Sequence, residues 1–195
     1  MWNYVTKFEN TIKEIVGAPY GVAIDSCTHA IFISLLWQKE HGITEVGLPK
    51  RTYISVPNMC KHLDLKINWH DEPWKGSYNI VGTKTIDSAC HFSENTYMPG
   101  YHHCLSFHHR KTLSTVRGGM ILTDDKDFEE WARLMIYDGR DKNKLMKDDK
   151  PTLCAFHFYM PPETAMLGLE NLNKLKSFNL EPIASEQDYD DVSYI

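Results

Sequence analysis

Hydrophobic residues recur three or four positions apart in five segments of the chain, and this period predicts helices there. In the segment 127–137, for example, Phe128, Trp131 and Leu134 fall on one helix face. Gly17 and Gly42 each follow one of these segments, at a place where a left-handed residue commonly ends a helix. The predicted helices cover residues 9–16, 28–41, 55–63, 127–137 and 162–178.

Short apolar runs bounded by turn residues predict strands between these helices. They cover residues 20–24, 44–48, 65–69, part of 79–89, 104–107 and 119–122. Strands and helices alternate in the first third of the chain, which favours an α/β domain with a mostly parallel sheet. The polar segment 138–152 is expected to be a loop, and residues 181–195 are expected to be a poorly ordered tail or an arm.

The composition is that of an ordinary globular domain. The chain has 195 residues, of which 42% are hydrophobic and 24% charged, and these values exclude disordered, collagenous and coiled-coil classes. The longest apolar run, residues 30–37, is too short to cross a bilayer, and charges stand where a signal peptide would be apolar. Five cysteines without a Cys-x-x-Cys motif indicate a reducing compartment. We therefore expect a cytoplasmic protein.

The formal net charge of −5 comes from the end of the chain. Residues 181–195 hold five carboxylates and no Lys or Arg, so residues 1–180 are formally balanced. A neutral body has no broad field for a nucleic-acid backbone or an anionic membrane, and neither is expected as a partner. The sequence thus divides into a domain of residues 1–180 and an acidic tail of residues 181–195.

Two candidate sites lie next to predicted strands. The run Asp25-Ser26-Cys27-Thr28 stands between a strand and a helix, where free amides and a Thr hydroxyl suit a phosphate group. Plain capping of the helix is the alternative. Asp87 follows a buried strand, at the edge of an open α/β sheet where ligands bind. The alternative for Asp87 is a loop residue that caps the next turn.

The third candidate is a lysine in a patterned loop. Ser106 and Lys111 are five residues apart, with aromatic residues and histidines around them and the pair Gly118-Gly119 after them. A lone Lys after a strand is usually solvated. This setting instead favours a Lys amine held over a cofactor, with the Ser hydroxyl on the cofactor's phosphate.

Histidines and cysteines are dense between residues 90 and 109, so a metal site has to be weighed. His102 and His103 are adjacent and would point to opposite faces of a strand, as would His108 and His109. Each pair could therefore offer one ligand to a given site. Their spacing matches no known zinc pattern, and we predict no metal.

Taken in order, these segments resemble the DegT/DnrJ/EryC1/StrS family of sugar aminotransferases, which are pyridoxal phosphate enzymes of the aspartate aminotransferase fold type. The resemblance covers roughly residues 8–175 and depends on the ordered set rather than on any one motif. It implies a three-layer α/β sandwich, in a shortened form of the family's large domain. The matching stretches are GAPYGVAIDSCTHA (17–30), TYIS (52–55), IDSA (86–89), SFHHRK (106–111), GGMILT (118–123), DGR (138–140) and the start of the helix after Met160.

The resemblance implies roles for individual residues. Lys111 matches the Lys that binds the cofactor covalently, and Asp87 matches the carboxylate that pairs with its pyridine nitrogen. A buried carboxylate keeps that nitrogen protonated, which makes the ring an electron sink. Tyr53 stands where the family has an aromatic residue stacked on the ring. Contacts to the cofactor's phosphate are implied for Ser106 and for the amides near Cys27 and Thr28.

Two positions differ from the family's pattern. Cys90 stands where the family usually has a His or Gln that touches the 3-oxygen of the cofactor. His157 stands near the place of an Asn that reaches the partner subunit's phosphate. The chain between Tyr53 and Asp87 is also shorter than in the family, and we expect the protein to lack the family's small carboxy-terminal domain.

The resulting hypothesis is a homodimeric aminotransferase that binds pyridoxal 5′-phosphate at Lys111. The amino donor would be glutamate and the acceptor a keto sugar, nucleotide-linked, with an active site shared between subunits. Without a small domain, the substrate pocket should be open unless residues 181–195 fold back over it. Two other readings remain: a degenerate protein or a different pyridoxal phosphate reaction on the same fold, and a His/Cys metal-binding protein without the cofactor.

Overall fold

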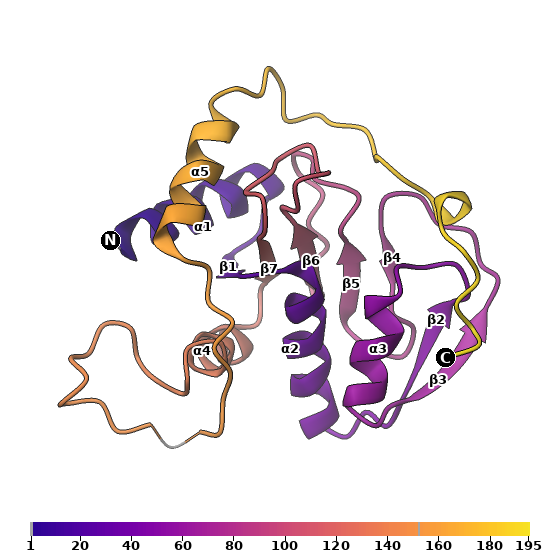
Figure 1. The fold of residues 1–195 in the computed structure, drawn as a ribbon, viewed down its shortest axis with the longest axis horizontal. Coiled ribbons are helices and arrows are strands. Elements are labelled where there is room, and N and C mark those ends of the chain that lie inside the picture. Colours follow the sequence, from indigo (N-terminus) through magenta and orange to yellow (C-terminus); the bar gives the residue numbers. More distant parts are fainter. Residues whose placement is uncertain (1, 152) are drawn as a thin grey trace.

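A five-stranded sheet forms the centre of the computed structural model, which describes residues 2–151 and 153–195. Thr152, the last residue of the predicted loop, therefore lies outside the described residues. A second, two-stranded sheet continues the layer beyond β4 through a bridge between Gly47 and Val81 (Figure 1). The five-stranded sheet has the order β1 (Tyr20–Ile24), β7 (Gly119–Thr123), β6 (His102–Ser106), β5 (Thr85–Ser88), β4 (Tyr78–Asn79), and the second sheet pairs β2 (Glu45–Pro49) with β3 (Lys66–His70).

The five-stranded sheet is mixed, which corrects the prediction of a mostly parallel sheet. Only β5 and β6 pair in parallel within it, while β4–β5, β6–β7 and β7–β1 are antiparallel. The connection from β6 to β7 holds no helix, and strands joined without a crossover element pair antiparallel. β2 and β3, which are joined through a helix, are parallel as predicted.

The segment 79–89 forms parts of two strands rather than one. β4 and β5 pair antiparallel, with Asn79 opposite Ile86. Gly82 lies in the turn between them with a φ of +82°, a conformation that costs glycine little. The turn lets this short hairpin occupy the place between β5 and the two-stranded sheet.

Helices cover both faces of the sheet, so the three-layer α/β arrangement is confirmed. Alternate strand residues face opposite layers: Ile121 packs with α2, α3 and α4, whereas Met120 and Leu122 pack with α1 and α5. On one face lie α1 (Trp2–Val16) and α5 (Pro162–Leu172), and on the other α2 (Cys27–Glu40), α3 (Ser55–His62) and α4 (Lys126–Met135).

Two helix ends differ from the prediction. α1 begins at Trp2 rather than near residue 9, because Val5 and Phe8 extend its buried face. α5 ends at Leu172 rather than at residue 178. The carbonyl of Phe178 accepts hydrogen bonds from the backbone of Glu94 (2.8 Å) and from the Ser93 hydroxyl (3.0 Å), which takes the chain out of the helix.

Residues 181–195, here called the acidic arm, run back across the sheet and end beside β2 and β3 (Figure 1). The amide of Ile183 donates to the Cys90 carbonyl (2.9 Å), and the amide of Val192 donates to the Lys50 carbonyl (2.8 Å). A single 3-10 turn, η1 (Glu186–Asp188), interrupts the segment. Of the two expectations for this segment, a poorly ordered tail or an arm, the structure shows the arm, because the segment packs on the domain.

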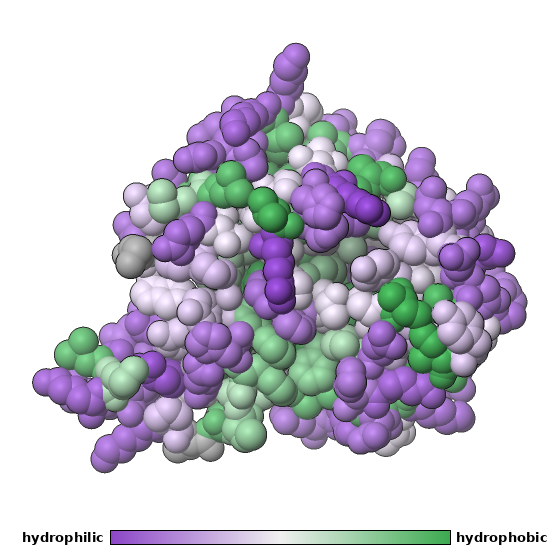
Figure 2. Space-filling view, in the orientation of Figure 1, coloured by the Kyte–Doolittle hydropathy of each residue, from purple (hydrophilic) through white to green (hydrophobic). Residues whose placement is uncertain are grey.

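Within the described residues, no helix is both long and apolar enough to span a bilayer. Hydrophilic side chains cover most of the face seen in Figure 2, and apolar ones gather over the lower part of α2. Partly exposed Phe32, Phe156 and Phe158 pack on that side of the core.

His102 and His103 lie on opposite faces of β6, as the alternation of strand residues predicts. His102 stacks on Phe128 (3.8 Å between ring centroids), and its Nδ1 lies 2.9 Å from the Ser34 hydroxyl. The Nε2 of His103 accepts from the amide of Met98 (3.1 Å). Burial is the main cause that lowers the pKa of each imidazole from 6.5 to about 4.

Because these two imidazoles have lowered pKa values, we predict that the free energy of unfolding decreases as the pH is lowered. Both are neutral in the folded protein, so their contribution is present above pH 6.5 and is lost as the pH falls towards 4. Each shift corresponds to about 3 kcal/mol at most. We expect the urea midpoint at pH 4.5 to lie well below that at pH 7, and His102→Asn to reduce the difference. The exposed His62→Asn is the matched control, and an equal pH dependence in His102→Asn would contradict the assignment.

Candidate active site

A cavity of about 560 Å³ opens where β5 and β6 end and α2 begins. This volume lies in the range of small-molecule and cofactor sites. The chain between β6 and β7 forms one wall and the acidic arm forms another. Seven of the eight residues predicted for the site line this cavity: Cys27, Thr28, Tyr53, Asp87, Cys90, Ser106 and Lys111.

The start of α2 presents backbone amides and hydroxyls to the cavity. Ser26 caps the helix by accepting from the amide of His29 (3.2 Å), so the helix begins at Cys27, one residue before the predicted start. The first amides of a helix have no acceptor within it, which suits them to an anion. The Thr28 hydroxyl lies 2.9 Å from that of Ser55, the first residue of α3.

Gly119 allows the start of α2 to approach β7. A Cβ at this position would lie 2.5 Å from the carbonyl carbon of Ser26 and 2.6 Å from the amide nitrogen of Cys27. The thiol of Cys27 donates to the carbonyl of Cys104 in β6 (3.2 Å). Burial raises the pKa of this thiol well above its ordinary value, so Cys27 offers the cavity its backbone rather than a thiolate.

Asp87 is a buried carboxylate with two hydrogen-bond donors. Its Oδ1 accepts from the amide of Ala89 (2.9 Å), and its Oδ2 accepts from the hydroxyl of Tyr78 (3.0 Å). Burial raises the pKa of Asp87, while these two hydrogen bonds and the charge of Lys111 lower it. Among the described residues no Lys or Arg nitrogen is within ion-pair distance of Asp87. A cationic N–H in the cavity would therefore stabilise its ionised form.

The amine of Lys111 turns towards the same end of the cavity. Its Nζ donates to the Sγ of Cys90 (3.3 Å), and that sulfur lies 3.3 Å from the hydroxyl of Tyr189 in the acidic arm. Cys90 is 4% exposed. Among the described residues Lys111 thus contacts a cysteine sulfur rather than a carboxylate, which leaves its amine available for chemistry.

The loop that carries Lys111 makes this wall of the cavity basic. His108, Arg110 and Arg117 line the cavity beside it. Arg117 forms an ion pair with Asp25 (2.8 Å), next to the start of α2. Slight burial, followed by the neighbouring cationic groups, lowers the pKa of His108. An anionic ligand would find a favourable potential on this side.

His157 lies outside the cavity, on the surface beside α4. Its Nδ1 is 2.7 Å from the carboxylate of Asp138, and its side chain is 67% exposed. It lies between two aromatic residues, Phe156 and Phe158, whose rings stack 4.9 Å apart. The chain on its own therefore does not bring His157 to the other seven residues, and its predicted contact needs a second subunit.

Three further residues of the site were missed by sequence reasoning. Tyr78 bonds to Asp87, Trp74 lies against Tyr78 (5.0 Å between ring centroids), and Tyr189 lies against Trp74 (5.4 Å). All three are aromatic residues: Tyr78 begins the two-residue strand β4, and Trp74 and Tyr189 lie outside helices and strands, so none of them belongs to a segment with a clear hydrophobic period. The sole signal was the concentration of aromatic residues in segments without a helical or strand period.

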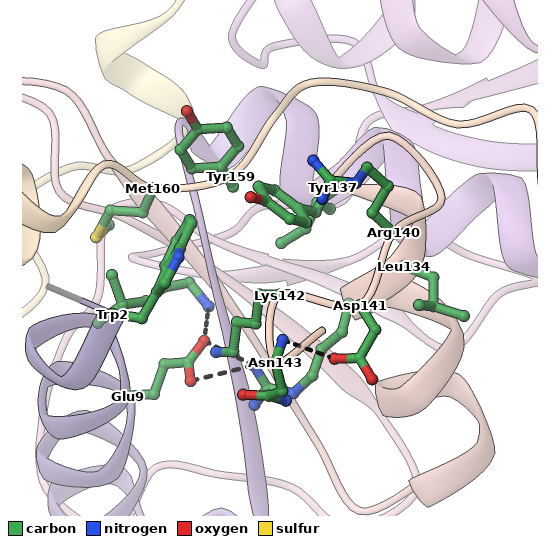
Figure 3. Close-up of a pocket in the computed structure, with 14 residues that line it drawn as sticks. Trp2, Glu9, Leu134, Tyr137, Arg140, Asp141, Lys142, Asn143, Tyr159 and Met160 are labelled. Carbon is green, nitrogen blue, oxygen red and sulfur yellow. Dashed lines mark hydrogen bonds and ion pairs between the residues drawn. The ribbon is translucent and has the colours of Figure 1, made fainter. Parts of the chain in front are cut away.

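A second, smaller cavity of about 60 Å³ lies between α1 and the chain after α4. Trp2, Tyr137 and Tyr159 surround it with their rings, as Figure 3 shows. Glu9, at its base, already has hydrogen-bond partners, because its carboxylate accepts from Arg133 (3.0 Å) and from the amide of Ala23 (2.8 Å). This cavity is too small for a cofactor, and its base is formed by the buried ion pair of Glu9 and Arg133.

Three solved structures of sugar aminotransferases share this fold at low sequence identity. CalS13 from Micromonospora echinospora superposes with a TM-score of 0.72 at 15% identity, over 88% of this chain and 60% of the other. PseC from Helicobacter pylori, described as acting in pseudaminic acid biosynthesis, gives 0.74 at 17%, over 88% and 57%. Spr1654 from Streptococcus pneumoniae, in its PMP form, gives 0.71 at 16%, over 88% and 58%. The chain thus spans less than two thirds of each.

Comparison with curated proteins gives no match. The model of the DegT/DnrJ/EryC1/StrS aminotransferase family, by contrast, matches residues 1–73 and 98–191. The unmatched segment 74–97 holds β4, β5, Asp87 and Cys90, so the site combines matched and unmatched parts. Because the match takes in most of the chain, this protein belongs to the DegT/DnrJ/EryC1/StrS aminotransferase family.

Proposed function

We propose that this protein is a pyridoxal phosphate-dependent aminotransferase that moves an amino group from glutamate to a nucleotide-linked keto sugar. One observation carries the proposal. A buried carboxylate, Asp87, and a lysine amine, Lys111, which has no carboxylate partner among the described residues, share a cavity that is bounded by the start of a helix. Family membership supports the reaction class, and the basic loop supports an anionic substrate.

The residues present fit pyridoxal phosphate. Its phosphate needs an anion site, which the first amides of α2 and the hydroxyls of Thr28 and Ser106 would provide. Its protonated ring nitrogen needs a carboxylate, and Asp87 is a buried one without a cationic partner among the described residues. Its ring needs an aromatic neighbour, and Tyr53, 59% exposed, lines the cavity.

The reaction divides between the cofactor and this chain's own residues. Pyridoxal phosphate would supply a carbonyl group that takes up an amino group and a ring that withdraws electrons. Lys111 would act first as the nucleophile that holds the cofactor and then, once released, as the base and acid that moves a proton at its Nζ. Asp87 would hold the proton on the ring nitrogen throughout.

Two measurements test the proposal with the protein as it exists. The purified chain should show a visible absorbance band on addition of pyridoxal phosphate, and the band should change when glutamate is added. ¹⁵N-labelled glutamate should then transfer its label to a nucleoside-diphosphate keto sugar. A band without any label transfer would rule out the aminotransferase and leave a binding protein, whereas the absence of a band would also rule out the cofactor.

The proposal includes a homodimer in a reducing, cytoplasmic compartment. The five cysteines are all free thiols. His157 is exposed among half-buried aromatic rings, and burial of those rings against a second copy would bring it to the partner's phosphate site. We expect a dimer by sedimentation at micromolar concentration, and weaker binding of pyridoxal phosphate in His157→Ala than in the exposed control His62→Ala. A fully loaded monomer would contradict this part.

A further inference from the structure

The wall of the cavity opposite the basic loop is built from two segments, one outside the match to the family model and one mostly inside it. One is residues 74–97, which that model does not match. The other is the acidic arm, whose docking partners lie mainly in that same segment. The amide of Gly76 donates to the carbonyl of Ala184 (2.8 Å), and the amide of Glu186 donates to the carbonyl of Trp74 (3.2 Å). Residues 74–97 and the arm are therefore joined into one wall.

The arm is seated by a close approach that only glycine permits. Gly76 has a φ of +76°, and a Cβ there would lie 2.6 Å from the Cβ of Pro182 and 3.0 Å from that of His91. The carboxylate of Glu186 accepts from the amide of Trp74 (3.1 Å), and Arg51 donates to the carbonyl of Tyr189 (3.0 Å). These contacts fix the arm on both sides of η1.

Tyr189 is the arm residue that reaches furthest towards the reacting groups. Its hydroxyl lies 3.3 Å from the Sγ of Cys90, which in turn contacts the amine of Lys111. Burial raises the pKa of this hydroxyl, so it stays protonated and can donate as well as accept. The ring rests against Trp74, which limits its rotation. A ligand above Lys111 would meet an oriented, uncharged hydroxyl on this side.

The charges of the two walls differ in sign. The loop wall carries Arg110, Lys111 and Arg117, whereas the arm carries Glu186, Asp188, Asp190 and Asp191 without a Lys or Arg. An elongated substrate with one anionic end would point that end to the loop and its uncharged part to the arm. The arm wall is thus suited to hydroxyl groups rather than to phosphates.

We infer that the acidic arm is part of the substrate site and that Tyr189 is a specificity-determining contact to the hydroxyl-bearing sugar portion of the acceptor. The inference rests on the proposed function. The arm thereby supplies a wall to a cavity that, from sequence, was expected to be open. Cofactor binding does not depend on the arm, because Asp87 lies on β5, Lys111 lies on the loop between β6 and β7, and the amides that suit the phosphate lie at the start of α2.

The test compares two matched pairs of variants in the full chain loaded with pyridoxal phosphate. Tyr189→Phe removes one hydroxyl, and Tyr194→Phe does the same at a residue that is 82% exposed. Gly76→Ala unseats the arm, and Gly100→Ala introduces the same strain at a φ of +85° where a Cβ meets no described atom within 4 Å. The readouts are the cofactor's absorbance band, the KM and kcat for nucleoside-diphosphate keto sugars, and hydrogen exchange of residues 183–192.

We expect Tyr189→Phe to raise the KM for the keto sugar by about tenfold, the cost of one buried hydrogen bond, with the absorbance band unchanged. Gly76→Ala should raise the same KM and speed hydrogen exchange of the arm, and both control variants should behave as the wild type. Unchanged KM values in Tyr189→Phe and Gly76→Ala of an active enzyme would overturn the role of the arm alone. No amino transfer by the wild type would instead overturn the proposed function, and the substrate class with it.

Discussion

Replacing Lys111 with arginine is expected to lower amino transfer by about a thousandfold or more, which corresponds to about 4 kcal/mol of lost transition-state stabilisation. Arginine keeps the positive charge near Asp87 but cannot lose a proton at neutral pH, so it offers neither a nucleophile nor a base. The amine of Lys111 lies in the cavity with the Asp87 carboxylate, and its hydrogen bond to Cys90 holds it there.

Borohydride reduction followed by peptide mass spectrometry measures the covalent link directly. The wild type should carry a phosphopyridoxyl group on the peptide that contains Lys111, and the Lys111→Arg variant should carry none. Lys126→Arg is the control, because Lys126 lies on the surface in an ion pair with Glu130. Label on another lysine in the wild type would show that the assignment of Lys111 is wrong.

Replacing Asp87 with asparagine is expected to lower turnover by about a hundredfold or more while some cofactor stays bound, equivalent to about 3 kcal/mol. The amide has nearly the same shape and can still accept from Tyr78 or Ala89, but it carries no charge to keep the ring nitrogen protonated. Loss of the charge therefore removes the electron sink without removing the binding site.

The affinity for pyridoxal phosphate should also depend on pH through Asp87. Burial raises the pKa of Asp87 in the free protein, so a cofactor that binds through a cationic N–H should bind less tightly as the pH falls and the carboxyl becomes protonated. In Asp87→Asn that part of the pH dependence should disappear. Asp124→Asn is the control, since Asp124 follows β7 and, like Asp87, accepts a hydrogen bond from a backbone amide, that of Gly100. Near-normal turnover in Asp87→Asn would exclude this role.

Much of the local structure could be predicted from the sequence, because it depends on neighbours along the chain. The apolar face of α4 has the helical period, and Ser26 is a side chain that caps a helix start, so both helices were found to within a few residues. Ser106, Lys111 and the glycine pair were found for the same reason, since their spacing within one loop is local. The family resemblance then implied roles for these positions, and the family match confirms the membership.

The order and direction of the strands were decided by the tertiary structure. β7 lies between β1 and β6 and is antiparallel to both. Because β5 and β6 are parallel, these antiparallel pairs make the sheet mixed. Strand direction depends on how each connection crosses the sheet, and the mostly polar and aromatic residues 107–118, which have no helical or strand period, do not indicate the path of their connection.

Sequence patterns also do not predict which residues form the walls of the cavity. Tyr78 meets Asp87 through a hairpin for which the sequence pattern predicts a single strand, and Tyr189 meets Cys90 across 99 positions of the chain. Such contacts leave no periodic signal, because each depends on a single pair of residues brought together by the whole fold. The sequence by itself therefore determined the helices, the lysine loop and the family, whereas the tertiary structure decided which side chains surround the lysine.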